Sequence, residues 1–219
     1  MKLMLTIWNE DYLMKDIVIV GAGHLGVDVY YLIREINEKS LQWRIRGFIN
    51  DVPADLARWD IAEPIIGTIQ DWSPVEGECY AMAIGSADGR HRIAELLKSR
   101  GCEFVTLISP YAIIYPTAEI GNGSIVISTS KIGPRAKVGD FCCIGDSTIG
   151  AGAIVGDYST TASYANIYQD IVVGSHTIVW SHAVVLRNVG DHAVVGAGSV
   201  VTSRARDGDR VFGPPARSF

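Results

Sequence analysis

The sequence predicts a two-part protein, an α/β unit at 14–108 followed by an all-β unit at 109–219 that is built as a parallel β-helix. Three observations predict it: an aliphatic residue that returns every six positions in the second half, a glycine-rich turn between a strand pattern and a helix pattern in the first half, and the absence of a flexible linker between them. The two parts are therefore expected to pack at a fixed angle.

The six-residue period indicates coils made of short strands and corners. The aliphatic anchors begin at Ile114, resume at Ile149 after one five-residue step, and resume at Val189 after one four-residue step. Six residues fit neither the helical period nor strand alternation, so each hexad forms one flat face and a corner. No hexad buries its apolar side alone, so the coils must stack roughly 4.8 Å apart. Sixteen anchors at three faces per turn predict about five coils.

The first part has the order of strand, turn and helix that binds phosphate. A strand pattern at 16–20 leads into a turn containing Gly21, Gly23, His24 and Gly26, and a helical pattern follows at 27–36. In this order, backbone amides and a helix N-terminus can hold phosphate. The alternative is that the glycines serve only close packing of the helix on the strand.

The rest of the first part predicts only half of a dinucleotide-binding fold, a Rossmann-like half domain. Further strands are expected at 44–49, 80–84 and 103–108, with a helix from about 89 to 99. No second half exists to place a nicotinamide, so hydride transfer by NAD is not expected. A sugar nucleotide needs one half only, with its diphosphate at the glycines and its base or ribose near Asn50 and Asp51.

Composition excludes several classes of function. The net charge is -5, and Lys and Arg do not form a block, so a nucleic-acid surface is not expected. No segment approaches the roughly 18 apolar residues of a membrane span. The four cysteines lack the spacing of metal ligands, which favours free thiols in the cytoplasm and no metal. Residues 1–13 are expected to be an upstream start or a packing arm.

The hexads resemble those of the hexapeptide-repeat acyltransferases. The resemblance is carried by 194–201 and by the closing run 213–217, Gly-Pro-Pro-Ala-Arg. It implies a left-handed parallel β-helix and a homotrimer. The residues alone do not give the handedness, because the rule for parallel crossovers favours a right-handed coil.

The whole chain after Met14 resembles the bacterial nucleotide-sugar and sialic-acid acetyltransferases, including those that acetylate bacillosamine and perosamine precursors. The matching stretches are the glycine turn, 47–51, Ala83-Ile84-Gly85 with Arg90, 107–110 and 213–216. One difference is visible in the turn, where the family reads Gly-His before the last glycine and this chain has His24-Leu25.

In that family a coil corner carries a histidine followed by an acid, with the histidine as general base. Matching the hexads places Ala151 at the histidine position and Gly152 at the acid; matching the preceding coil places Pro134 and Arg135 there instead. Neither match supplies a base. His176 and His182 are the possible substitutes, and His176 is expected to lie beside His192 on neighbouring coils. The alternative is that these histidines are solvated or pack between subunits.

Other residues are predicted to bind substrate or cofactor. In the first part Gly85, Ser86 and Arg90 are candidate substrate contacts. Tyr158, Tyr164 and Asn166 lie in the least regular coil, where Thr161 replaces an aliphatic anchor; they bind the sugar or form hydrogen-bonding ladders between coils. Resemblance implies coenzyme A along the prism between subunits. Its candidate contacts are Trp180, Gly196, Ala197, Arg204 and Arg217.

The function expected from the sequence is an acyl transfer from acetyl-CoA to a nucleotide-linked sugar in surface-glycan synthesis. The missing base favours an amino sugar, because a sugar amine has an unprotonated fraction near neutral pH, whereas a sugar hydroxyl does not ionise usefully there. Two alternatives stay open: a catalytically silent homologue that binds nucleotide sugars, and an O-acetyltransferase of a free sugar such as sialic acid.

Overall fold

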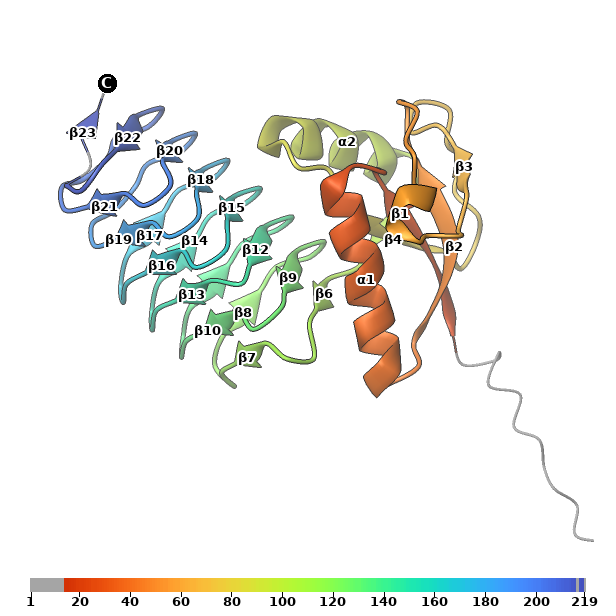
Figure 1. Ribbon diagram of the computed structural model, residues 1–219, viewed down its shortest axis with the longest axis horizontal. Helices are drawn as coiled ribbons and strands as arrows, with labels where there is room; N and C mark the ends of the chain where they lie inside the picture. Colours follow the sequence, from red (N-terminus) through yellow and green to blue (C-terminus); the bar gives the residue numbers. More distant parts are fainter. Residues whose placement is uncertain (1–13, 216, 219) are drawn as a thin grey trace, which may run out of the picture.

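The computed structural model describes residues 14–215, 217 and 218, and the expectation for residues 1–13 lies outside this range. The first part is a parallel sheet in the order β3-β2-β1-β4-β5 with two helices (Figure 1). Its elements are β1 (Lys15–Val20), α1 (His24–Lys39), β2 (Trp43–Ile49), the 3₁₀ turn η2 (Ala57–Trp59), β3 (Ile65–Gly67), β4 (Cys79–Met82), α2 (Ala87–Ser99) and β5 (Glu103–Phe104).

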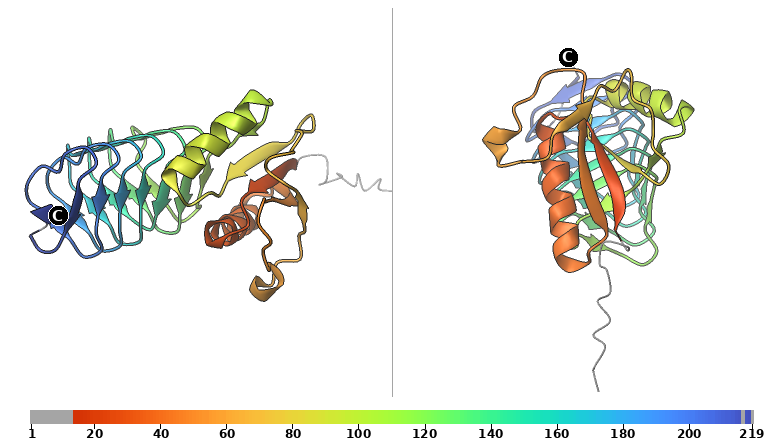
Figure 2. Two further views of the ribbon diagram at one scale, coloured as in Figure 1. Left: turned by 90° about the horizontal axis from the view of Figure 1, so that it is seen from above. Right: turned by 90° about the vertical axis from the view of Figure 1, so that its right-hand side faces the viewer.

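The second part is a parallel β-helix with three flat faces (Figures 1 and 2). The first face holds β6 (Leu107–Ile108), β9 (Ile125–Ile127), β12 (Cys143–Gly145), β15 (Thr160–Thr161), β18 (Ile178–Val179), β20 (Val194–Val195), β22 (Arg210–Phe212) and the antiparallel β23 (Arg217–Ser218). The second face holds β7 (Ile113–Ile114), β10 (Lys131–Ile132), β13 (Thr148–Ile149), β16 (Asn166–Ile167), β19 (Val184–Val185) and β21 (Val200–Val201). The third face holds β8 (Glu119–Ile120), β11 (Lys137–Val138), β14 (Ile154–Val155) and β17 (Val172–Val173).

Three columns of corners join the faces, and many corner residues have a positive φ. Corner 1 leads from the third face to the first and contains Phe141, Tyr158, His176 and His192. Corner 2 leads from the first face to the second and contains Asp146, Tyr164 and His182. Corner 3 leads from the second face to the third and contains Arg135, Gly152 and Asp170. Residues at the same corner of successive coils thus lie one above another, and glycine occupies some of these positions, such as Gly152.

The hexad anchors fill the prism, as the period predicts. The buried core of the coils includes Ile132, Ile144, Val155 and Val173, and each of these side chains is 0% exposed. Thr161 is also buried, and its hydroxyl lies 2.6 Å from the Ser147 hydroxyl, so the non-aliphatic anchor forms a hydrogen-bonded pair inside the prism. This position is a ladder between coils and not a sugar contact.

The sequence-based boundaries need three corrections. The first helix begins at His24, so the end of the glycine turn is already helical. The strand expected at 80–84 ends at Met82. The single strand expected at 103–108 is wrong: β5 pairs with β4 in the first sheet, whereas β6 pairs with β9 in the first coil. The chain crosses between the two parts within these six residues, and periodicity does not show such a change of partner.

Both helices of the first part lie against the coils (Figure 2). Residues of α1 share one apolar core with Leu107 and Ile125 of the first face. The helix α2 lies at corner 1, where Phe141 and Tyr158 join the core around Leu97. None of the helices within 14–215 is long and apolar enough to cross a membrane.

Candidate functional site

The glycine turn ends in an uncapped helix N-terminus. Gly21 has a φ of 108°, and a Cβ at Gly26 would lie 2.3 Å from the Gly21 carbonyl oxygen, so both positions require glycine. The N-cap Gly23 offers no side chain, and the first turn of α1 contains no acid among the described residues. The amides that begin this 16-residue helix therefore face outward with a partial positive charge, the arrangement that binds phosphate.

The second helix differs in this respect. Ser86 caps α2 by accepting a hydrogen bond from the Gly89 amide at 3.3 Å, and Asp88 adds a carboxylate to the first turn. The N-terminus of α2 thus already has a hydrogen-bond acceptor, the Ser86 hydroxyl, and a negative charge, the Asp88 carboxylate. Of the two helix N-termini at the carboxyl edge of this sheet, α1 is the one suited to a ligand phosphate.

Asn50 and Asp51 follow β2 at the same edge, as predicted, but both hold the protein together. Asn50 Oδ1 accepts a hydrogen bond from the Ala22 amide at 3.2 Å, and its amide nitrogen donates to the Val52 carbonyl. Asp51 Oδ1 accepts hydrogen bonds from the amides of Ile69 and Gln70. One oxygen of Asp51 therefore fixes a loop, and the exposed remainder of the carboxylate is the part left for a ribose.

The prediction that Arg90 contacts substrate does not agree with the structure. Its side chain is 2% exposed, and all three guanidinium nitrogens donate hydrogen bonds. Nε donates to the Phe141 carbonyl at 2.7 Å and Nη2 to the Tyr158 carbonyl at 2.6 Å, while Nη1 donates to Ile84 and Gly85. Burial lowers the pKa of Arg90. Arg90 therefore joins the first part to the corners of the coils, a role that a sequence motif does not reveal.

Asp28 is a candidate that the sequence did not suggest. It lies one turn into α1 after His24 with part of its side chain exposed, and partial desolvation raises the pKa of its carboxyl. Its charge also acts on the buried Cys143 thiol of β12, which places it at the junction between α1 and the first face. Carboxyls with a shifted pKa beside a ligand-binding turn are common in functional sites. Only its position in the folded chain distinguishes Asp28 from other helical acids.

Both candidate positions for the family histidine lie in one hollow. Pro134 and Ala151 occupy corner 3 on consecutive coils, since the Gly152 amide donates to the Pro134 carbonyl at 2.9 Å. The hollow has a volume of about 750 Å³. It is lined by Thr117, Glu119, Pro134, Arg135, Lys137, Ala151, Gly152, Ile154, Gln169 and Asp170. The hollow thus contains carboxylates and cations but no imidazole, whichever match is used.

The histidines considered as substitutes lie at two other corners. His176 is at corner 1, and its ring lies 4.7 Å from that of His192, which confirms the expected neighbouring pair. His176 Nδ1 lies 3.1 Å from Asp88 Oδ1. His182 is at corner 2 and stacks on Tyr164, which is 63% exposed. Tyr158, predicted to bind the sugar, is instead buried in corner 1 between Phe141 and His176, and Asn166 is half-buried on the second face.

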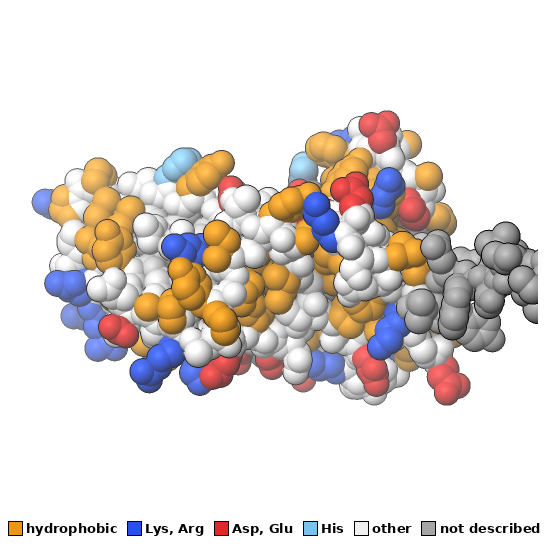
Figure 3. All heavy atoms as spheres, turned by 90° about the horizontal axis from the view of Figure 1, so that it is seen from below, with side chains coloured by type: hydrophobic (Ala, Val, Ile, Leu, Met, Phe, Trp, Pro, Cys, Tyr) orange, Lys and Arg blue, Asp and Glu red, His pale blue; other side chains and the backbone are white. Residues whose placement is uncertain are grey.

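The residues expected to bind coenzyme A lie in the last coils. Arg204 and Arg217 line one hollow of about 510 Å³, together with Arg206. Basic side chains gather at this end of the prism in Figure 3. Gly196 lies beneath the Phe212 ring, which would meet a Cβ at 2.1 Å, and Ala197 beside it is exposed. Trp180 is 47% exposed at the end of β18. The two predicted arginines are therefore brought together, as a phosphate site requires.

All four cysteines are free and buried, so their reactivity toward a thiol reagent tests whether the protein is folded as described. Burial raises the pKa of Cys142 to about 12 and also raises the pKa of Cys79, Cys102 and Cys143. Because the thiolate is the reactive form, we expect a disulfide reagent to label none of them in the native protein from pH 7 to 9 and all four after denaturation. Rapid labelling of the native chain at pH 8 would contradict the burial of these thiols.

This chain joins a parallel α/β sheet to a parallel β-helix, and solved structures of sugar acetyltransferases have the same fold. The resemblance deduced from the motifs is confirmed: the solved structures to which the chain is similar include the acetyltransferase domain of PglB and a perosamine N-acetyltransferase. A search against protein-family models finds no match.

The particular similarities are as follows. The chain is 33% identical over 103 residues to the bifunctional protein GlmU of Rhizobium rhizogenes, which covers 43% of this chain and 23% of GlmU. The chain thus spans about a quarter of the length of the curated relatives it matches. The acetyltransferase domain of PglB from Neisseria gonorrhoeae has a TM-score of 0.85 at 23% identity, covering 94% of this chain and 100% of that one. PerB from Caulobacter crescentus, solved with CoA and GDP-perosamine, has a TM-score of 0.82 at 21% identity, covering 93% and 97%. These likenesses show the fold, a parallel β-helix consistent with the left-handed type.

Proposed function

We propose that the protein transfers an acetyl group from acetyl-CoA to the amine of a nucleotide-linked sugar. The observation that carries the proposal is the uncapped N-terminus of α1 directly after a glycine turn, at the carboxyl edge of a parallel sheet. Such a site holds the diphosphate of a nucleotide with backbone amides. Two proteins with the same fold support it. The acetyltransferase domain of PglB was solved with acetyl coenzyme A, and PerB was solved with CoA and GDP-perosamine.

The proposal treats the first part as a Rossmann-like half domain for the nucleotide, and the coils as a left-handed β-helix for the acyl donor. The strand order β3-β2-β1-β4-β5 and the break between β5 and β6 support a division between Phe104 and Leu107, a few residues before the predicted boundary at 108. Gly21, Gly23, His24 and Gly26 would surround the diphosphate, while Asn50, Gly85 and Ser86 lie at the same edge. Arg204 and Arg217 would meet the phosphates of coenzyme A.

A homotrimer is part of this proposal. The first part packs on the first face and corner 1, whereas the hollow with Ala151 lies at corner 3, the corner that does not border the first face. We propose that a sugar held at the glycine turn is served by the hollow of a neighbouring subunit. Large hydrophobic side chains are exposed along the coils, and Figure 3 shows several clusters of hydrophobic side chains on this part of the surface. They include Ile113, Tyr115, Ile154, Tyr164, Tyr168, Val172 and Trp180. Exposed hydrophobic side chains on several coils are what a subunit interface would cover.

The chemistry requires little of the protein beyond positioning. The unprotonated amine attacks the thioester carbonyl carbon, the C–S bond breaks, and coenzyme A leaves as the thiolate. The proton that the amine nitrogen loses passes through water to the thiolate, so that the products are the amide and the free thiol. Holding both substrates together supplies on the order of 7 to 11 kcal/mol, whereas a positioned base supplies about 10²- to 10⁴-fold. We propose that Ala151 occupies the family's histidine position, which removes the second contribution and leaves the first.

We predict that purified protein acetylates nucleotide-linked amino sugars at least about 10²-fold faster than the corresponding hydroxyl sugars, because only the hydroxyl needs the missing base. Release of coenzyme A is followed with a thiol reagent, for which the buried cysteines give no background. UDP-, GDP- and dTDP-linked sugars are compared in parallel. Transfer to a hydroxyl and to no amine would refute the N-acetyl assignment.

Thermal shift separates the remaining alternatives. Protection by both coenzyme A and a nucleotide sugar fits the transferase. Protection by the nucleotide sugar alone fits a catalytically silent binding protein, and protection by coenzyme A and free sialic acid without nucleotide fits an O-acetyltransferase. A localisation in the cytoplasm, where acetyl-CoA is made, belongs to the same proposal.

A further inference from the structure

A column of aromatic rings follows corner 1 along four coils. Phe141 and Tyr158 stack with centroids 5.4 Å apart, Tyr158 and His176 lie 5.1 Å apart, and His176 and His192 lie 4.7 Å apart at an interplanar angle of 23°. The residues of this column have positive φ values of 52–58°, a conformation that aromatic and imidazole side chains adopt only at a cost. The coils place the two imidazoles at its outer end, one directly above the other.

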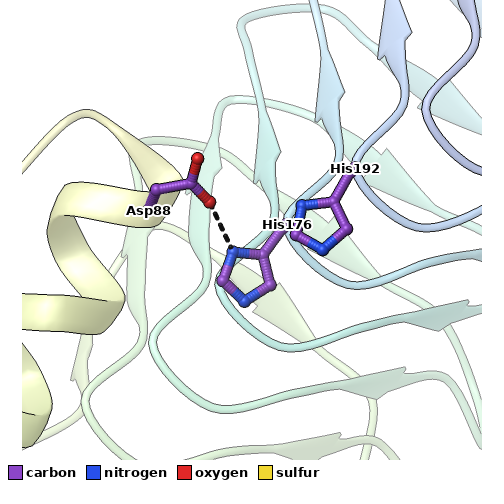
Figure 4. A group of neighbouring side chains, drawn as sticks. All are labelled: Asp88, His176 and His192. Atoms are coloured by element: carbon purple, nitrogen blue, oxygen red, sulfur yellow. Dashed lines mark hydrogen bonds and ion pairs between the residues drawn. The ribbon is translucent and has the colours of Figure 1, made fainter.

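The helix α2 brings a carboxylate and a third imidazole to the same place. Asp88, in the first turn of α2, lies with Oδ1 3.1 Å from His176 Nδ1. The His91 ring is 4.4 Å from that of Tyr158 and 5.1 Å from that of His176. Figure 4 shows Asp88 pointing from α2 toward His176, with His192 on the next coil beyond it. Three of the five histidines of the chain therefore meet at the junction between the two parts.

The geometry points to a binding site for a transition-metal ion, with Zn²⁺ as the best fit, formed by Asp88, His176 and His192. One ligand atom from each of these residues lies within 4.8 Å of the other two. Ligand atoms that share a tetrahedral zinc at 2.0–2.2 Å are about 3.3 Å apart. The carboxylate of Asp88 is 82% exposed and His192 is also exposed, so both side chains can turn inward by the remaining distance.

The donor atoms select the class of metal. Two imidazole nitrogens and one carboxylate oxygen suit Zn²⁺, Cu²⁺ or Ni²⁺, whereas Ca²⁺ and Mg²⁺ require mostly oxygen ligands. Three protein ligands leave a fourth position for water. The ion would take the place of the hydrogen bond between His176 and Asp88, and its charge would hold the carboxylate beside two neutral imidazoles.

The backbone on both sides of this site is fixed before any ion binds. The His176 amide donates to the Asp157 carbonyl at 2.8 Å, and the His192 amide donates to the Ser175 carbonyl at 2.9 Å. The buried Arg90, two residues after Asp88, attaches α2 to the carbonyls of Phe141 and Tyr158 at the same corner. Ligands on rigid elements lose little freedom when they bind, which favours affinity. A bound ion would thus link α2 to two coils at once.

The test is calorimetric titration of ZnCl₂ into protein that has been treated with a chelator and freed of any polyhistidine tag. We expect one ion per chain and a rise in the melting temperature with zinc. His192→Ala and Asp88→Asn should each weaken zinc binding by at least about tenfold, since each removes one of three ligands. Both positions are exposed, so the variants should fold. Mg²⁺ at the same concentration should give no shift.

The matched control is His182→Ala. His182 lies at corner 2 and stacks on an aromatic ring like its counterpart His176, but none of its described contacts is with a carboxylate. This variant should bind zinc with the affinity of the original protein. Equal weakening in His182→Ala and His192→Ala would show that zinc binds scattered surface histidines and would overturn the proposal, as would the absence of binding below millimolar zinc. Cobalt substitution gives an independent readout, because the visible spectrum of bound Co²⁺ should change in Asp88→Asn.

Discussion

Arg90→Ala is expected to destabilise the protein by about 3–5 kcal/mol. The change removes the guanidinium that donates hydrogen bonds to the carbonyl oxygens of Phe141 and Tyr158. Each buried acceptor that loses its donor lowers the free energy of unfolding by about 1–3 kcal/mol. It also leaves a cavity where a 2% exposed side chain stood. Urea unfolding, followed by tryptophan fluorescence and by far-ultraviolet circular dichroism, measures the loss.

Arg92→Ala is the control for Arg90, because it removes an exposed arginine from the same helix. It should change the free energy of unfolding by no more than about 0.5 kcal/mol. Arg90→Lys should recover only a part of the loss, since one ammonium group cannot reach acceptors on both sides of the junction. Similar stabilities for Arg90→Ala and Arg92→Ala would mean that the junction does not depend on this side chain.

Gly26→Ala is expected to destabilise the protein by about 1–3 kcal/mol and to abolish protection by nucleotide sugars. The new methyl group would lie 2.3 Å from the Gly21 carbonyl oxygen, so α1 must move away from β1 to admit it. The amides that begin α1 would move with the helix, away from the position proposed for the diphosphate. Unfolding in urea measures the first effect, and thermal shift with UDP-, GDP- and dTDP-linked sugars measures the second.

Gly85→Ala provides the comparison for stability, because a Cβ at this exposed position meets no atom within 4 Å. Its free energy of unfolding should stay within about 0.5 kcal/mol of the original. If Gly26→Ala is as stable as Gly85→Ala and still binds the nucleotide sugar, the glycine turn serves neither close packing nor phosphate binding.

The fold of the coils could be predicted because the pattern that specifies it is local and repeated. An anchor such as Val155 or Val173 is buried by the same rule at every coil, so one period determines the faces, the corners and the stacking of His176 on His192. The irregular steps did not break the stacking. After the four-residue step the third face continues beyond β17 only as single bridges, from Val173 to Val189 and from Val189 to Ala205, but the other two faces keep their strands. Thr161 kept its inward position by pairing with Ser147.

The glycine turn was found for a similar reason, since strand, turn and helix follow one another directly in the chain. Its two explanations were not separable from the sequence. The structure shows that Gly26 is needed for packing, and it also shows that the helix N-terminus after it has no side-chain cap. The packing explanation is therefore supported at Gly26, while phosphate binding at the helix N-terminus stays a prediction.

The sequence by itself determined the two kinds of architecture, the burial of the anchors and the family of acetyltransferases that the chain resembles. Only the tertiary structure decided what lies at the junction between the two parts. It assigned Arg90 to the interior, placed Asp88 beside His176, and set Ala151 in a hollow away from the first face. Periodicity describes neighbours along the chain, whereas these contacts join residues about 50 to 90 positions apart, and their partners are chosen by how α2 packs on the coils.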